Sequence, residues 1–252
     1  MCTIILRHDT RADASILVGV NRDEYRDRPS APPDVREGEA GGRFFAPRDR
    51  RAGGTWLGIN SNGVFAALTN RFGARTDEDR NSRGELVPLC LAEPDAASAA
   101  AALEEVQPRT YNAFHLVVAD PDGVFVAASD GRRCSVARGG TDLYVVTERS
   151  VGAADNPRKA AVRTRCRELQ TENRLSPQSL QRLLSRPCGP PSESVCVDVA
   201  DGAYGTCSSV TARFGPGTAE WQYADGPPCE TAYQDQSDEL ARLLQTGGDD
   251  RK

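Results

Sequence analysis

A hairpin that is apolar along both of its strands constrains the fold of this chain more than any other feature. Residues 55–59 and 64–69 are almost continuously apolar, and Asn62-Gly63 between them is a common signal for a tight turn. A strand with one face in water alternates apolar and polar residues, so continuous apolarity indicates burial on both faces. We therefore expect a sheet that is covered by another sheet on one face and by helices on the other.

The order of the remaining elements extends this arrangement to the whole chain. Strand patterns precede the hairpin and follow it, in blocks separated by helical patterns. This order predicts an α+β fold, a four-layer αββα sandwich of two antiparallel sheets. We expect one domain over 1–246 and a polar tail over 247–252. Besides the hairpin, strands are expected over 2–8, 15–20, 112–119, 124–128, 133–137, 143–147, 193–199, 206–213 and 219–223, and helices over 83–92, 95–106, from Asn156-Pro157, from Ser176-Pro177 and over 237–245.

One long segment has no regular pattern. Residues 25–42 contain three prolines and three glycines and show no hydrophobic period. The composition predicts a long loop, either a cover over a functional site or a mobile surface excursion.

Composition excludes several classes of function. The net charge of −5 provides no basic field for nucleic acid. No stretch approaches the roughly 20 apolar residues of a membrane span, and the N-terminus lacks a signal-peptide pattern, so we expect a cytoplasmic protein. For the same reason we expect the eight cysteines to be free thiols. With two histidines, His8 and His115, and no C-x-x-C pair, no metal site is predicted.

Cys2 is the first candidate for catalysis. Removal of Met1 would leave its thiol beside its own α-amine, whose pKa near 7.7–8.0 makes it a usable base. A free thiol near pKa 8.5 needs such activation. The alternative is that Met1 remains and Cys2 is an inert residue of the first strand. His8 is a poor partner, because six residues of strand would put it roughly 20 Å away.

Polar residues at two expected strand ends could complete such a site. Asn21, Arg22 and Asp23 follow the second strand, and Asn70 ends the apolar hairpin. Asp23 could orient the terminal amine, and Arg22 could favour the thiolate or hold an anionic substrate. Asn70 could donate to a developing oxyanion. The alternatives are a salt-bridged turn and a simple strand-terminating residue.

Taken together, these motifs resemble the NRDE protein family, the family of the transport and Golgi organisation protein 2. The resemblance covers nearly the full chain. It rests on Met1-Cys2-Thr3-Ile4, Val20-Asn21-Arg22-Asp23-Glu24-Tyr25, Gly53-Gly54-Thr55-Trp56-Leu57-Gly58, Leu68-Thr69-Asn70-Arg71, Ser82-Arg83-Gly84-Glu85-Leu86 and Tyr204-Gly205-Thr206.

The family in turn resembles N-terminal nucleophile hydrolases of the choloylglycine hydrolase kind. By that resemblance Cys2 would be nucleophile and base, with Asn21, Arg22, Asp23 and Asn70 as catalytic partners. Within the same motifs we expect Trp56, Arg71 and Arg83 to bind substrate; the alternative for the two arginines is a solvated, ion-paired rim. Two departures stand out: Glu148 occupies the place of an asparagine of the hydrolases, and Cys207 that of an arginine found in many relatives.

The resemblance implies two functions from different classes. The first is an amidohydrolase that cleaves a C–N amide bond of a small molecule through a thioester on Cys2. The second is a non-catalytic protein that binds or traffics haem or an acyl ligand, for which the departures at Glu148 and Cys207 argue. A third is a purely structural interaction protein. We expect a small-molecule partner and no cofactor other than haem as a ligand; the oligomeric state is left open.

Overall fold

Two antiparallel sheets of seven strands each form the centre of the protein. The computed structural model describes residues 2–10, 15–38, 41–140, 142–150, 156–186, 194–199 and 202–249. The first sheet has the order β10-β1-β2-β12-β13-β14, with β11 paired to β12, and the second runs in chain order from β3 to β9. The strands of the first sheet are β1 (Cys2–His8), β2 (Ile16–Tyr25), β10 (Leu143–Thr147), β11 (Asp198–Val199), β12 (Tyr204–Gly215), β13 (Thr218–Ala224) and β14 (Gln234–Asp235). Those of the second are β3 (Ser30–Glu37), β4 (Arg43–Asp49), β5 (Leu57–Asn60), β6 (Phe65–Asn70), β7 (Phe114–Asp120), β8 (Gly123–Ser129) and β9 (Cys134–Arg138).

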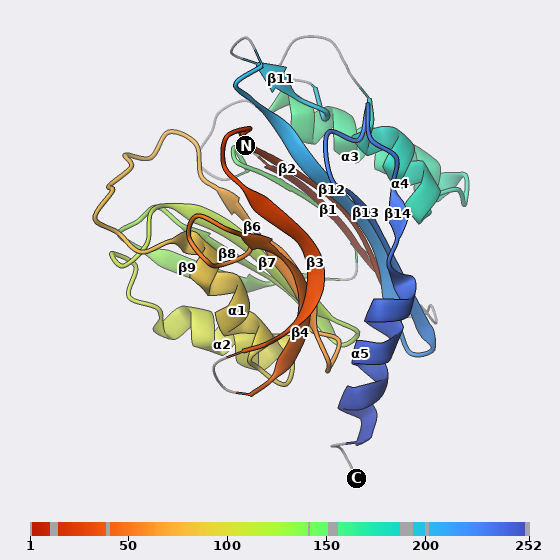
Figure 1. The fold of residues 1–252 in the computed structure, drawn as a ribbon, viewed down its shortest axis with the longest axis horizontal. Coiled ribbons are helices and arrows are strands. Elements are labelled where there is room, and N and C mark those ends of the chain that lie inside the picture. Colours follow the sequence, from red (N-terminus) through yellow and green to blue (C-terminus); the bar gives the residue numbers. More distant parts are fainter. Residues whose placement is uncertain are drawn as a thin grey trace.

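Helices cover the outer face of each sheet (Figure 1). On the second sheet lie α1 (Leu86–Leu91), which follows the 3-10 turn η1 (Arg83–Glu85), and α2 (Ala96–Glu105). On the first sheet lie α3 (Pro157–Thr171) and α4 (Pro177–Leu184). The last helix, α5 (Ser237–Asp249), packs against β13 and β4 and so spans both sheets at one edge. The predicted four-layer αββα sandwich is confirmed.

The apolar hairpin has both faces buried, as its sequence predicts. Phe65 and Ala67 of β6 belong to the core between the two sheets, with Val18 and Trp221 from the first sheet. Alternate residues such as Leu68 belong to a second core beneath α1 and α2. A third core lies between the first sheet and helices α3 and α4. Side chains alternate across a strand, so a middle layer has to be apolar at every position.

Four sequence-based expectations about the elements are wrong in part. Residues 21–24 lie within β2, not after it, because their backbone pairs with β1 and β12. The expected loop over 25–42 contains β3, which pairs with β4, a strand that the sequence did not suggest. Within 193–199, β11 covers 198–199, and residue 193 lies outside the described residues. Helix α5 continues to Asp249 and so includes the start of the expected tail.

The expectation of free thiols is also wrong for two cysteines. Cys196 and Cys229 form a disulfide that joins the segment before β11 to the loop after β13. Among the described residues five other cysteines are free, and two of these, Cys90 and Cys166, are buried in apolar layers; Cys188 lies outside the described residues. No helix of the described chain is both long and apolar enough to cross a membrane.

Candidate functional site

Strand pairing places Cys2 and Arg22 side by side. The antiparallel register of β1 and β2 sets Cys2 directly opposite Arg22. Residues opposite one another in such a pair project to the same face of the sheet. Ile4 and Val20, the next pair on this face, belong to the core between the sheets, so Cys2 and Arg22 lie at the end of that layer.

A pocket of about 490 Å³ opens at this end of the inter-sheet layer. Cys2 is half-buried on its wall. The lining also contains most of the site residues expected from the sequence, namely Arg22, Asp23, Trp56, Asn70 and Arg83. Residues from β1, β2, β6 and the η1 turn therefore meet here, although they are far apart along the chain.

Arg22 is held in place by an aromatic ring. Its guanidinium carbon lies 4.4 Å from the ring centroid of Trp56, in the geometry of a cation–π contact. Both side chains are buried. The cation therefore stands at a fixed position beside Cys2. Burial raises the pKa of the Cys2 thiol above its ordinary value, and the charge of Arg22 opposes this shift only weakly.

Asp23 contributes to the lining of the same pocket, and its carboxylate is fully buried in a network of polar groups. Its Oδ1 accepts a hydrogen bond of 2.7 Å from the Thr206 hydroxyl, and its Oδ2 lies 3.6 Å from Nη1 of Arg158. Burial raises the pKa of Asp23 to about 6, against the influence of Arg158. A carboxyl group of this kind changes its charge close to neutral pH and could orient an amine.

Arg158 also balances the charge of Glu148. Its Nη1 lies 3.6 Å from Oε2 of Glu148, whose Oε1 lies 3.7 Å from Nε of Arg149. Glu148 is buried and is not part of the pocket lining. The carboxylate that replaces an asparagine of the hydrolases is thus compensated by two arginines.

Sequence reasoning missed Arg158. It lies in the first turn of α3, after the cap that Asn156 provides. A cation in that turn is disfavoured by the helix dipole, so its position there was a usable indication of buried anions nearby.

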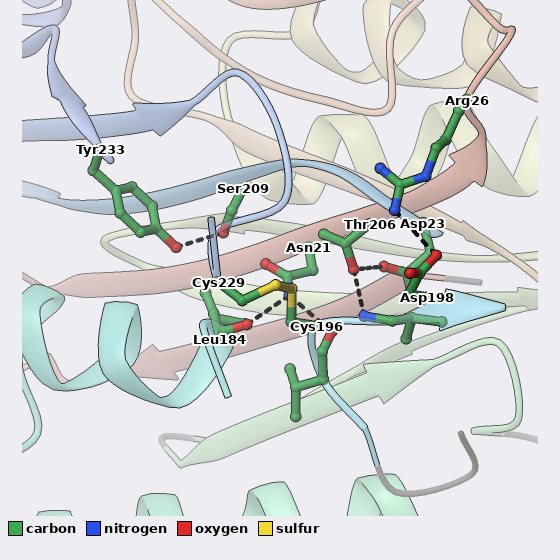
Figure 2. Close-up of a disulfide and its surroundings, with 12 residues drawn as sticks. Asn21, Asp23, Arg26, Leu184, Cys196, Asp198, Thr206, Ser209, Cys229 and Tyr233 are labelled. Atoms are coloured by element: carbon green, nitrogen blue, oxygen red, sulfur yellow. Dashed lines mark hydrogen bonds and ion pairs between the residues drawn. A yellow bond between two sulfur atoms is a disulfide. The ribbon is translucent and has the colours of Figure 1, made fainter. Parts of the chain in front are cut away.

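The side chain of Asn21 lies away from the pocket and binds backbone carbonyl groups. Its Nδ2 donates to the carbonyl oxygens of Leu184, at 3.1 Å, and Val195, at 2.9 Å. Figure 2 shows this amide beside the disulfide of Cys196 and Cys229, next to Leu184 at the end of α4. Asn21 and Arg22 point to opposite faces of β2, so the tetrapeptide at 21–24 divides its side chains between the inter-sheet pocket and the helix-covered side of the sheet.

The other expected residues differ in their access to the pocket. Asn70 ends β6 with an exposed side chain that lines the pocket. Arg83, in η1, lines it as well and donates from Nη1 to the carbonyl of Ala113 at 3.0 Å. Arg71 is absent from the lining, and its backbone N–H donates to the same carbonyl of Ala113.

Neither histidine lies at the pocket. His8 is at the far end of β1, where its Nε2 is 3.0 Å from the carbonyl oxygen of Pro121. His115 is fully buried in β7, and burial lowers its pKa to about 4, so the ring is neutral at pH 7. Cys207 occupies a bulge in β12 opposite β2, and its thiol faces the carbonyl oxygens of Glu24 and Gly205, each at 3.4 Å.

Solved structures with the same architecture include a conjugated bile acid hydrolase, an acid amidase and a penicillin V acylase. A mutant conjugated bile acid hydrolase from Clostridium perfringens matches with a TM-score of 0.58 and 11% identity, over 94% of this chain and 93% of that one. The N-acylethanolamine-hydrolyzing acid amidase ortholog of Caenorhabditis elegans gives 0.53 and 15%, over 86% and 94%. Penicillin V acylase from Agrobacterium tumefaciens gives 0.51 and 13%, over 94% and 86%. The fold is that of the N-terminal nucleophile hydrolases.

Sequence comparison places the chain within a family. The model of the Transport and Golgi organisation 2 family matches residues 1–212, and the chain therefore belongs to that family. The Transport and Golgi organization 2 homologs of Mus musculus and Homo sapiens are each 32% identical to it, over 127 and 128 residues respectively. In both cases the match covers 48% of this chain and 45% of the relative, so it spans about half the length of the curated relatives.

Proposed function

We propose that this protein is an amidohydrolase that cleaves a C–N amide bond of a small molecule, with Cys2 as an N-terminal nucleophile after loss of Met1. The observation that carries the proposal is the convergence of Cys2, Asp23 and Asn70 on one pocket. Each has the chemistry that its expected role needs: a thiol, a carboxyl that can hold an amine, and an amide donor.

The shifted pKa of Cys2 supports the α-amine as base. Burial raises the pKa of the thiol, so most of it is protonated at neutral pH and a base is needed. Among the described residues that line the pocket there is no histidine. An α-amine on Cys2 would stand beside both its own thiol and Asp23, and its ordinary pKa suits proton transfer at neutral pH.

The reaction then proceeds in two steps, acylation of Cys2 and hydrolysis of the resulting thioester. The thiol proton moves to the α-amine, the sulfur attacks the amide carbonyl carbon, and Asn70 donates to the oxyanion. The tetrahedral intermediate collapses: the C–N bond breaks, and the leaving nitrogen takes the proton from the α-ammonium. Water then adds to the thioester with the α-amine as base, the C–S bond breaks, and the sulfur regains its proton.

The test uses an activated acyl donor because the natural substrate is unknown. Intact mass should show a chain that begins at Cys2, and p-nitrophenyl hexanoate should leave one hexanoyl group on that residue. Cys2→Ala should lose the adduct, whereas Cys207→Ala, which removes another half-buried thiol near Arg22, should keep it. An alanine inserted before Cys2 keeps the thiol but removes its α-amine, and should slow acylation at least 100-fold. Acylation at full rate in that insertion variant, or on a chain that keeps Met1, contradicts the proposal.

The alternative function is a non-catalytic binder of an acyl ligand or haem on the same fold. The raised pKa of the half-buried Cys2 thiol also fits this alternative, because an unactivated thiol can line a binding pocket without reacting. Haem held through a histidine fits poorly, since His8 and His115 are both buried away from the pocket. An acyl ligand is the better form of this alternative. Tight binding of octanamide, together with absence of an acyl adduct from p-nitrophenyl hexanoate, would favour it over hydrolysis.

A further inference from the structure

The charged groups that line the pocket around Cys2 are unequally paired. Its five arginines and five acidic residues give no net charge. Three of the arginines form ion pairs with carboxylates: Arg28 with Glu24 and Asp49, Arg51 with Asp27, and Arg80 with Asp77. Within the described chain, Arg22 and Arg83 have no carboxylate within 4 Å. The charges of both interact with that of Cys2.

Arg22 is a buried cation with donor capacity left over. It is 3% exposed, and its Nη1 has no hydrogen-bond partner among the described residues. The stack on Trp56 covers one face of the guanidinium but satisfies none of its N–H groups in the ring plane. A buried charge with unmet donors is costly unless an anion approaches it.

Arg83 reaches the pocket from η1, and its side chain is half-buried and also has few partners. Of its five N–H donors, the structure gives a partner to one nitrogen, Nη1, on the carbonyl of Ala113. Burial lowers the pKa of this guanidinium, and nearby Arg28 lowers it further, against the attraction of Glu24. An anion in the pocket would relieve both the desolvation and the repulsion.

We propose that the pocket binds a small molecule with a carboxylate or phosphate group, held by Arg22 from β2 and Arg83 from η1 beside the sulfur of Cys2. The planar fork of arginine suits both groups, which it can bind through two parallel hydrogen bonds. The inference deepens the proposed function and rests on the same pocket: the amide cleaved would belong to an anionic substrate. The paired rim arginines would then shape the entrance and leave the two inner ones to recognise charge.

The experiment compares charged and neutral probes of one shape by binding alone. Octanoate, octyl phosphate and octanamide are titrated into Cys2→Ala protein, with calorimetry and tryptophan fluorescence as readouts. Trp56 lies against Arg22, and the second tryptophan, Trp221, is fully buried in the core, so a fluorescence change reports on the pocket. The variants are Arg22→Met, Arg22→Lys and Arg83→Met. Arg132→Met, which removes an exposed arginine outside the pocket, is the matched control.

We expect at least one of the two anions to bind at least tenfold more tightly than octanamide. Arg22→Met and Arg83→Met should each abolish that preference, and Arg132→Met should preserve it. Arg22→Lys keeps the charge without the fork and should retain part of it, which also separates loss of charge from loss of folding. The inference is overturned if charged and neutral probes behave alike, including the case in which none binds, or if Arg132→Met removes the preference. Binding needs no turnover, so failure of the hydrolytic proposal leaves this result readable.

Discussion

Nη1 of Arg158 lies 3.6 Å from Oδ2 of Asp23, although the two residues come from the first turn of α3 and from the middle of the sheet in β2. The same nitrogen lies 3.6 Å from Glu148. One buried cation is therefore shared by two carboxylates directly behind the pocket. The position and the charge of Asp23, and with them any amine that it orients, depend on this helix terminus.

Removal of that cation should be strongly destabilising. Arg158→Met leaves two buried carboxylates without their shared partner and should lower the free energy of unfolding by about 3–5 kcal/mol. Urea denaturation measures the change. Adding Glu148→Gln to Arg158→Met should recover part of the loss, because one like charge is removed. Arg165→Met, on the same helix but in an exposed pair with Glu168, should have a much smaller effect on stability. Equal effects of the two substitutions would contradict this account.

His115 should make the protein less stable in mild acid. Its pKa falls from an ordinary 6.5 to about 4 on folding, so the unfolded state binds the proton first. Stability is full above pH 6.5 and declines as the pH falls toward 4, by on the order of 3 kcal/mol. Asp23 acts in the opposite direction, because its raised pKa favours the folded state below about pH 6. The test is therefore the difference between wild type and His115→Leu, and a difference that does not change between pH 7 and pH 4 would contradict the prediction.

Gly54 should tolerate no side chain. A Cβ at this position would lie 2.5 Å from the carbonyl carbon and oxygen of Gly84, which is backbone of η1. Gly54→Ala would push η1 away and so displace Arg83, which precedes Gly84 in that turn. We expect a loss of roughly 1–3 kcal/mol of stability. Gly42→Ala is the control, because nothing lies within 4 Å of its Cβ position. Similar melting temperatures for the two variants would show that the turn can move freely.

The disulfide should contribute measurably to stability. Cys196 and Cys229 are 33 residues apart in the sequence, and a closed loop of that length is worth about 3–4 kcal/mol through the entropy of the unfolded chain. Purified protein should have a lower melting temperature with reductant than without it. The double variant Cys196→Ser with Cys229→Ser should have the lower melting temperature both with and without reductant. An effect of reductant on the double variant equal to that on wild type would place the sensitivity elsewhere.

Much of the fold could be predicted from local sequence pattern. The apolar strands of the hairpin, the capped starts of α3 and α4, and the strands from β7 to β10 all follow from spacing and capping residues. The missed strands, β3 and β4, lack such a pattern. β3 contains Pro32 and Pro33 at a register shift on the edge of its sheet, where an absent N–H costs little.

The candidate site could be predicted from the sequence only in part. Cys2, Asp23 and Asn70 were expected by type of chemistry and Arg83 from the family motifs, and each lines the pocket. Their catalytic and binding roles remain predictions. Asn21 was expected at the site because it adjoins Arg22 and Asp23 in the sequence. Side chains alternate along a strand, however, and that of Asn21 points toward α4. Nothing in the local pattern of Cys196 and Cys229 indicated that they would pair.

The sequence by itself determined which layers would form and which residue types were available for chemistry, because burial pattern and side-chain reactivity are local properties of the chain. Only the tertiary structure decided that Arg158 lies beside both Asp23 and Glu148. It also decided that Arg22 and Arg83 line the pocket without a carboxylate partner among the described residues. Charge balance depends on distance in space, and distances between β2, η1 and α3 are set by how the sheets and helices pack.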